Sequence, residues 1–135
     1  MIFEQYIEKE TAILAKAKGF DEECTYLWGV VHGHDGEGYE GRHKWDNVNH
    51  LCNEKQFSAP RQEEVQKWLR EIHKIHVEPM YDCNQNIYNC HFVVYYKGEN
   101  NSPRWEEYTR FYHVNSYEQA LEMGLKEALA LIKIT

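Results

Sequence analysis

The chain has no long apolar run. The longest stretches, such as Tyr26 to Val31, span only a handful of residues, whereas a helix that crosses a bilayer needs about 20. The first residues also lack the basic and apolar segments that mark a secretory signal. We therefore expect a soluble, cytoplasmic protein that does not bind a membrane.

Positive charge is scarce and scattered. The 15 Lys and Arg residues stand against 22 Asp and Glu residues, so the 135-residue chain is acidic, with a formal net charge of −7 at pH 7. Binding to nucleic acid depends on clustered cationic side chains that release counterions from phosphates. We therefore expect no nucleic acid as a partner.

Cysteine and catalytic motifs are scarce as well. The four cysteines occur without an export signal, so we expect reduced thiols and no structural disulfide. Cys90 and His91 are neighbours on an expected strand and would point to opposite faces, which argues against a paired nucleophile and base. No phosphate-binding loop, nucleophile elbow or dinucleotide fingerprint occurs. We assign no catalytic residues.

The chain does contain enough apolar material for one domain over residues 1–135. Apolar residues make up 42% of the sequence, and this length is common for a single domain. Periodicity predicts helices at 2–18, 60–74 and 117–132, and strands at 24–31, 76–82, 87–97 and 107–114. Between about 32 and 56 the periodicity disappears, which predicts a long Gly- and His-rich loop.

The predicted order of elements is α-β-loop-α-β-β-β-α. The last three strands follow one another without intervening helices. We therefore expect an α+β fold with an antiparallel sheet of three to four strands covered by helices.

Five residues predict local geometry. Gly19 should end the first helix, with Phe20 folding back on the last turn as in a Schellman motif. Pro79 has no N–H to donate, so its strand belongs at a sheet edge or a bulge. Ser116 begins a capping box for the last helix. Gly124 lies on the apolar stripe of that helix and would allow a close approach to the sheet.

The long loop contains four candidate metal ligands, His32, His34, Asp35 and His43. Imidazole and carboxylate groups suit zinc or another first-row divalent ion. Their spacing matches no closed metal-binding motif, so a solvated loop whose histidines bind nothing is the competing interpretation. A small metal-dependent hydrolase that uses these four residues is our alternative hypothesis, and otherwise we expect no cofactor.

Aromatic residues of the last two strands favour a protein-binding surface. If helices cover only one face of the sheet, the opposite face could carry some of Val93, Tyr95, Tyr108 and Tyr112. Exposed aromatic clusters favour protein partners or self-association, for example as a homodimer. If the first helix or the long loop covers that face instead, the rings are buried and the hydroxyls remain wet.

Three separated segments carry recognisable motifs. They are Gly-Phe-Asp-Glu-Glu-Cys within 15–24, Phe-Ser-Ala-Pro and Lys-Trp-Leu-Arg-Glu-Ile-His within 57–73, and Ser-Tyr-Glu-Gln-Ala-Leu with Gly-Leu-Lys-Glu-Ala-Leu within 116–129. Together they resemble small uncharacterised proteins of gut anaerobic bacteria and their phages, although that pattern often has Pro in place of Glu23. The resemblance implies a phage or prophage accessory protein, and it implies no activity.

Our leading hypothesis is a noncatalytic accessory or protein-interaction protein that acts through the aromatic sheet face or the long loop. The three motifs also mark a helix end, a helix start and a capped helix, so they can preserve structure without preserving chemistry.

Overall fold

The computed structural model of the chain describes residues 6–22, 24–32, 38–48, 57–97, 100 and 102–133. The chain divides into two compact units, Met1–Arg61 and Gln62–Thr135. Two compact units are compatible with one or with two cooperative folding units, so the single domain stays a prediction.

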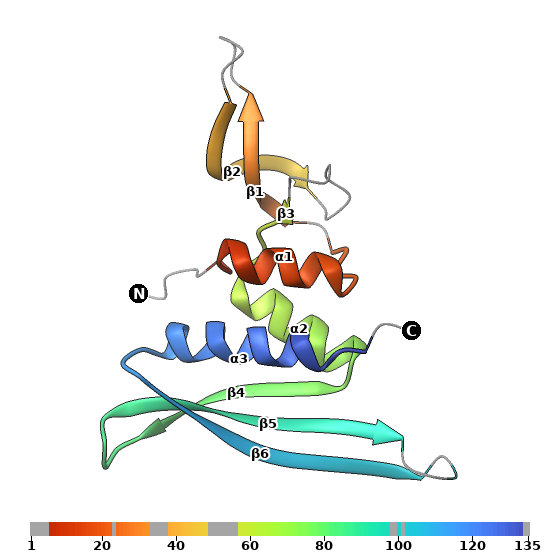
Figure 1. The fold of residues 1–135 in the computed structure, drawn as a ribbon, viewed down its shortest axis with the longest axis vertical. Coiled ribbons are helices and arrows are strands. Elements are labelled where there is room, and N and C mark those ends of the chain that lie inside the picture. Colours follow the sequence, from red (N-terminus) through yellow and green to blue (C-terminus); the bar gives the residue numbers. More distant parts are fainter. Residues whose placement is uncertain are drawn as a thin grey trace. The chain divides into compact units, whose positions relative to one another are not determined.

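One helix and three strands form the first unit (Figure 1). They are α1 (Lys9–Ala17), β1 (Cys24–His32), β2 (Gly38–Val48) and β3 (Phe57–Ser58). β1 is the central strand and pairs antiparallel with β2 on one side and β3 on the other. The indole N–H of Trp28 donates to the carbonyl of Ile7 at 2.9 Å, which ties β1 to the segment that precedes α1.

The end of α1 follows its local sequence signal. Gly19 has a φ of +93°, a conformation that favours glycine. The N–H of Phe20 donates to the carbonyl of Ala15 at 3.0 Å, and the Phe20 side chain is fully buried. The predicted Schellman-type helix end is confirmed.

The predicted loop at 32–56 is wrong over Gly38–Val48, which forms β2. This strand pairs with β1 from Gly38 opposite His32 to Val48 opposite Cys24. Charged residues occupy every second position in its middle, namely Glu40, Arg42, Lys44 and Asp46. Such alternation is a strand signal, and ladder hydrogen bonds need backbone groups and not apolar side chains. The rest of the predicted loop, 33–37 and 49–56, lies outside the described residues.

Three strands and two helices form the second unit. They are α2 (Gln62–Ile72), β4 (Ile75–Asp82), β5 (Ile87–Lys97), β6 (Pro103–Val114) and α3 (Tyr117–Leu131). The sheet order is β4-β5-β6, all antiparallel, and both helices lie on the same side of the sheet (Figure 1). The predicted α+β class, antiparallel sheet and element order are confirmed, with β2 and β3 added. Pro79 lies in β4, which is an edge strand as predicted.

The side of this sheet that faces the helices is closely packed. A Cβ added to Gly124 of α3 would lie 2.7 Å from Cys90 Sγ and 2.7 Å from Val77 Cγ1, so the predicted close approach is confirmed. The predicted helix cap is also confirmed, because the hydroxyl of Ser116 accepts from the N–H of Gln119 at 3.1 Å. These contacts fix α3 against β4 and β5.

Polar side chains hold α2 in place. Gln66 Nε2 donates to the carbonyl of Val77 at 2.6 Å. Gln62 Nε2 donates to the carbonyl of Glu118 at 2.9 Å and to Glu122 Oε1 at 3.0 Å, so this buried amide has partners on α3.

None of the described helices has both the length and the apolar character needed to cross a membrane.

Candidate interaction surface

The strand register assigns two faces to the β4-β5-β6 sheet. Residues directly opposite in antiparallel strands point to the same face, and successive residues alternate between faces. Cys90 points towards α3, because its thiol donates to the carbonyl of Ala120 at 3.0 Å. The residues that alternate with Cys90 and its partners therefore form the other face, which we call the open face. It includes His76, Glu78, Met80, Asn89, His91, Val93, Tyr95, Trp105, Glu107 and Thr109.

Large apolar side chains are exposed along β6. The Trp105 side chain is 55% exposed, and its ring meets the ring of Tyr95 edge-on at 4.9 Å between centroids. Phe111, further along the same strand, is 65% exposed. Exposed aromatic side chains on a sheet edge are typical of contact surfaces, since each can bury a large apolar area against a partner.

The register separates the four residues that the sequence grouped as a surface. Val93 and Tyr95 lie half-buried on the open face, opposite Glu107 and Trp105 respectively. Tyr108 is opposite Phe92 on the face beneath α3, and the two rings stack at 4.9 Å. Contact of any of these residues with a partner stays a prediction.

Tyr112 also lies on the helix side of the sheet. Its hydroxyl donates to Glu127 Oε2 of α3 at 3.4 Å, and Arg110 Nε donates to Glu127 Oε1 at 2.9 Å. Burial and, to a smaller extent, the nearby Glu127 carboxylate raise the pKa of both Tyr108 and Tyr112. The two tyrosines therefore stay protonated over the physiological range, and the hydroxyl of Tyr112 links β6 to α3.

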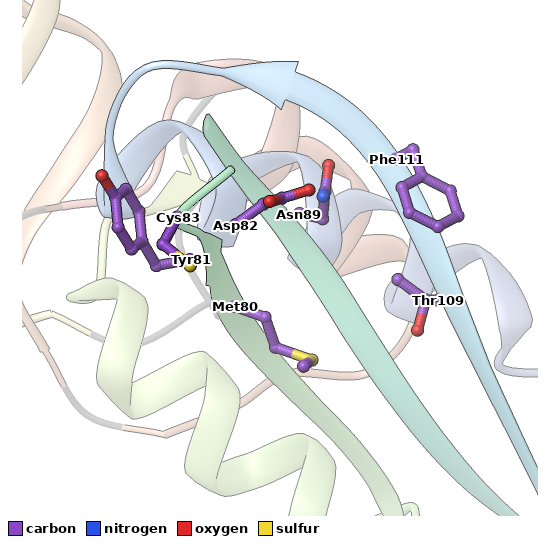
Figure 2. Close-up of a pocket in the computed structure, with 7 residues that line it drawn as sticks. All are labelled: Met80, Tyr81, Asp82, Cys83, Asn89, Thr109 and Phe111. Carbon is purple, nitrogen blue, oxygen red and sulfur yellow. The ribbon is translucent and has the colours of Figure 1, made fainter. Parts of the chain in front are cut away.

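A shallow groove of about 370 Å³ opens on the opposite side (Figure 2). Asn89 of β5 lies between Met80 and Asp82 on the β4 side and Thr109 and Phe111 on the β6 side. The Asn89 side chain is only 4% exposed, yet its Oδ1 has no hydrogen-bond partner within the described part of the chain. An unsatisfied buried carbonyl costs about 1–3 kcal/mol, so we expect an apolar residue of the same shape to be more stable at this position.

The centre of the open face carries a polar contact between His91 and Glu107. His91 Nε2 lies 2.7 Å from Glu107 Oε1, and the His91 Nδ1 atom lies 3.4 Å from the hydroxyl of Thr109. These three side chains form a connected polar cluster. They separate Trp105 at one end of β6 from Phe111 at the other.

The predicted metal ligands are only partly described. His34 and Asp35 lie outside the described residues, and of His32 and His43 only the backbone is described. Their register sets them apart, because His32 pairs with Gly38 whereas His43 pairs with Leu27. The five residue-to-residue steps from Leu27 to His32 correspond to roughly 17 Å. In the described ranges, no three His, Cys, Asp or Glu residues gather as a metal site would require.

The two described cysteine side chains differ in environment. Cys83 and Cys90 are both free thiols, the first exposed and the second buried. Burial, with smaller contributions from Glu127 and Glu78, raises the pKa of Cys90 to about 12. A thiol that stays protonated is a poor nucleophile. Cys90 also lies directly beneath Gly124, where it fills the space between β5 and α3.

Trp105, Phe111 and Asn89 were not singled out from the sequence. On the face of β6 that carries Trp105 and Phe111, the polar residues Glu107 and Thr109 lie between them. The other face of that strand mixes charged and aromatic residues in the same way. This strand therefore shows no clean apolar alternation that would tell its two faces apart. Only the β5–β6 register shows which residues of β6 lie on the open face.

Comparisons of the chain with protein families, with curated proteins and with solved structures found no match. The resemblance to small phage-associated proteins stays a prediction.

Proposed function

We propose that this protein is a noncatalytic interaction protein, of the accessory kind that the phage-type motifs imply, whose contact surface is the β6 side of the open face. The exposure of Trp105 and Phe111 on an edge strand is the observation that carries the proposal. Contact with another protein would remove both side chains from water.

Energetics favours this assignment over a passive surface. Burying an aromatic side chain fully contributes about 1.5–3 kcal/mol, and Trp and Phe are enriched in the cores of protein interfaces. The polar groups between Trp105 and Phe111 are already paired, since His91 lies against Glu107. A partner could therefore cover this surface while the Glu107 carboxylate keeps its contact with His91.

Photo-cross-linking tests the proposal. A benzophenone amino acid replaces Trp105 in one variant and Ile72 in a matched control, because Ile72 is also strongly exposed (61%) but ends helix α2. Irradiation in cells that express the protein should give defined protein adducts from position 105. Position 72 should give few or none.

The adduct masses decide between outcomes. Discrete adducts from position 105, either with a second copy or with another protein, would support the interaction surface. Equal labelling from positions 105 and 72, or no protein adduct from position 105, would overturn it.

A further inference from the structure

We propose that the protein pairs with a second copy of itself along β6, antiparallel and centred on Tyr108. This inference rests on the proposed function and names its partner. The result is a continuous six-stranded sheet, in which the β6 strands of the two copies lie side by side.

β6 is the more suitable of the two sheet edges. It is the last strand in the order β4-β5-β6, and within the described part of the chain no strand pairs with its outer side. β6 carries proline only at its first residue, Pro103, whereas β4 has Pro79 in its middle. Because proline cannot donate a ladder hydrogen bond, β4 is protected against strand addition and β6 is not.

Antiparallel geometry limits the possible registers of two identical strands. In an antiparallel strand pair, two residues that lie opposite each other behave alike. Both direct their backbone N–H and C=O groups towards the other strand, or both direct them away from it. Symmetric pairing of two β6 strands must therefore be centred on a residue, and not between two residues. Any residue of β6 can be such a centre, and Glu107, Tyr108 and Thr109 lie near the middle of the strand, so that centring on one of them pairs most of it.

The register centred on Tyr108 gives complementary pairs. Glu106 lies opposite Arg110 of the partner subunit, and the symmetry repeats this pair. Trp105 lies opposite Phe111 of the partner subunit, so the most exposed aromatic side chains of the two strands meet. Opposite charges and aromatic pairs across strands are the contacts that stabilise antiparallel pairing.

The neighbouring registers are worse. Centring on Glu107 places this carboxylate opposite its own copy, and it places Arg104 opposite Arg110 of the partner subunit. Centring on Thr109 places Glu106 opposite Tyr112 of the partner subunit, so no opposite charges face each other. Like charges directly opposite destabilise a strand pair, so the Tyr108-centred register is favoured.

The internal contacts of β6 are compatible with this pairing. Arg110 already binds Glu127 at 2.9 Å, and a guanidinium has enough donors to bind a second carboxylate. The irregular part of β6 lies after Arg110, since Arg110 pairs with Cys90 and Val114 pairs with Tyr88. Residues 106–110, the central part of the proposed pairing, are therefore regular strand.

Charge reversal tests the register. The Glu106→Arg variant would place Arg opposite Arg110 of the partner subunit, and the Arg110→Glu variant would place Glu opposite Glu106 of the partner subunit. Each reversal occurs twice in the dimer, so the dissociation constant should rise roughly thirtyfold. An equimolar mixture of the two variants forms a heterodimer in which both pairs attract again. Sedimentation velocity should therefore show dimer in the wild type and in the mixture, and mainly monomer in each variant alone.

Two controls accompany the test. Glu71→Arg and Lys67→Glu make the same charge changes on the exposed side of α2 and should leave the wild-type dimer intact. Circular dichroism shows whether each variant folds, and rescue in the mixture cannot arise from misfolded chains.

A wild-type monomer at about 1 mM would overturn the self-pairing. A dimer that neither reversal weakens, or single variants whose mixture stays monomeric, would also overturn it. Adducts between position 105 and a different protein would then leave the proposed function standing, so the two ideas can fail separately.

Discussion

The two faces of the β4-β5-β6 sheet differ in how completely their groups are satisfied. On the helix side, Gly124 lets α3 approach Cys90 and Val77 closely, and the Cys90 thiol donates to Ala120. On the open face, Phe111 is largely exposed and Asn89 Oδ1 is buried without a partner among the described residues. We infer that the packing on the helix side stabilises the fold, whereas the exposed Phe111 and the unpartnered Asn89 Oδ1 on the open face are not explained by stability alone.

Two phenylalanines on opposite faces give the largest contrast. Phe92→Ala should lower the free energy of unfolding by about 3–5 kcal/mol, because Phe92 is fully buried and the change leaves a cavity. Phe111→Ala should change it by about 0.5 kcal/mol or less, since this side chain is mostly in water. Urea unfolding at low protein concentration measures both. Equal losses would show that the open face is structural.

Overpacking tests the close approach of α3. Gly124→Val should lower the free energy of unfolding by about 3 kcal/mol, because the new Cβ would overlap Cys90 Sγ and Val77 Cγ1. Met123→Val, at the neighbouring exposed position of the same helix, should cost only about 0.5 kcal/mol through helix propensity. Thermal unfolding of both variants measures the difference. A Gly124→Val protein as stable as the Met123→Val protein would refute the packing.

Two buried amides should respond in opposite directions. Asn89→Leu should raise the free energy of unfolding by about 1 kcal/mol, since it removes an unsatisfied carbonyl and keeps the shape. Gln62→Leu should lower it by about 1–3 kcal/mol, because its Nε2 bonds to Glu118 and Glu122 would be lost. Chemical denaturation of the two variants measures both signs. A loss of stability in Asn89→Leu would mean that Asn89 is structural.

The smallest expected effect is a pH dependence on the helix side. Burial lowers the pKa of His73, whose ring lies edge-on against Trp68 at 4.6 Å. The unfolded chain, with a His pKa near 6.5, then binds more protons than the folded chain. Stability should therefore fall as the pH drops from about 6.5 towards the lower folded-state pKa. His73→Gln should weaken this dependence in unfolding curves between pH 5 and 7, and an unchanged curve would contradict it.

Local features of the fold could be predicted from the sequence because their causes are local. Gly19 ends α1, Ser116 caps α3, and Pro79 lies in an edge strand, and each signal depends on a few neighbouring residues. Gly124 was predictable because helical periodicity places it on the apolar stripe of its helix. The strand β2 was missed because its two-residue alternation is carried by charged residues and not by apolar ones.

The candidate surface was harder to predict, because its residues become neighbours only through strand register. Tyr108 and Tyr112 differ from Trp105 and Phe111 only in their parity along β6. The pairing of β6 with β5 decides which parity faces α3. A shift of one residue would exchange the two sets, and a single sequence contains no signal that fixes it.

Hydrogen exchange of the β6 amides at two protein concentrations tests the central claim most directly, since an unpaired edge is protected only when another strand binds it. We predict that alternate amides within residues 106–110 exchange more slowly at about 1 mM than at about 1 μM, while amides of β4 do not change. Exchange of the β6 amides at the same rate at both concentrations would contradict the account.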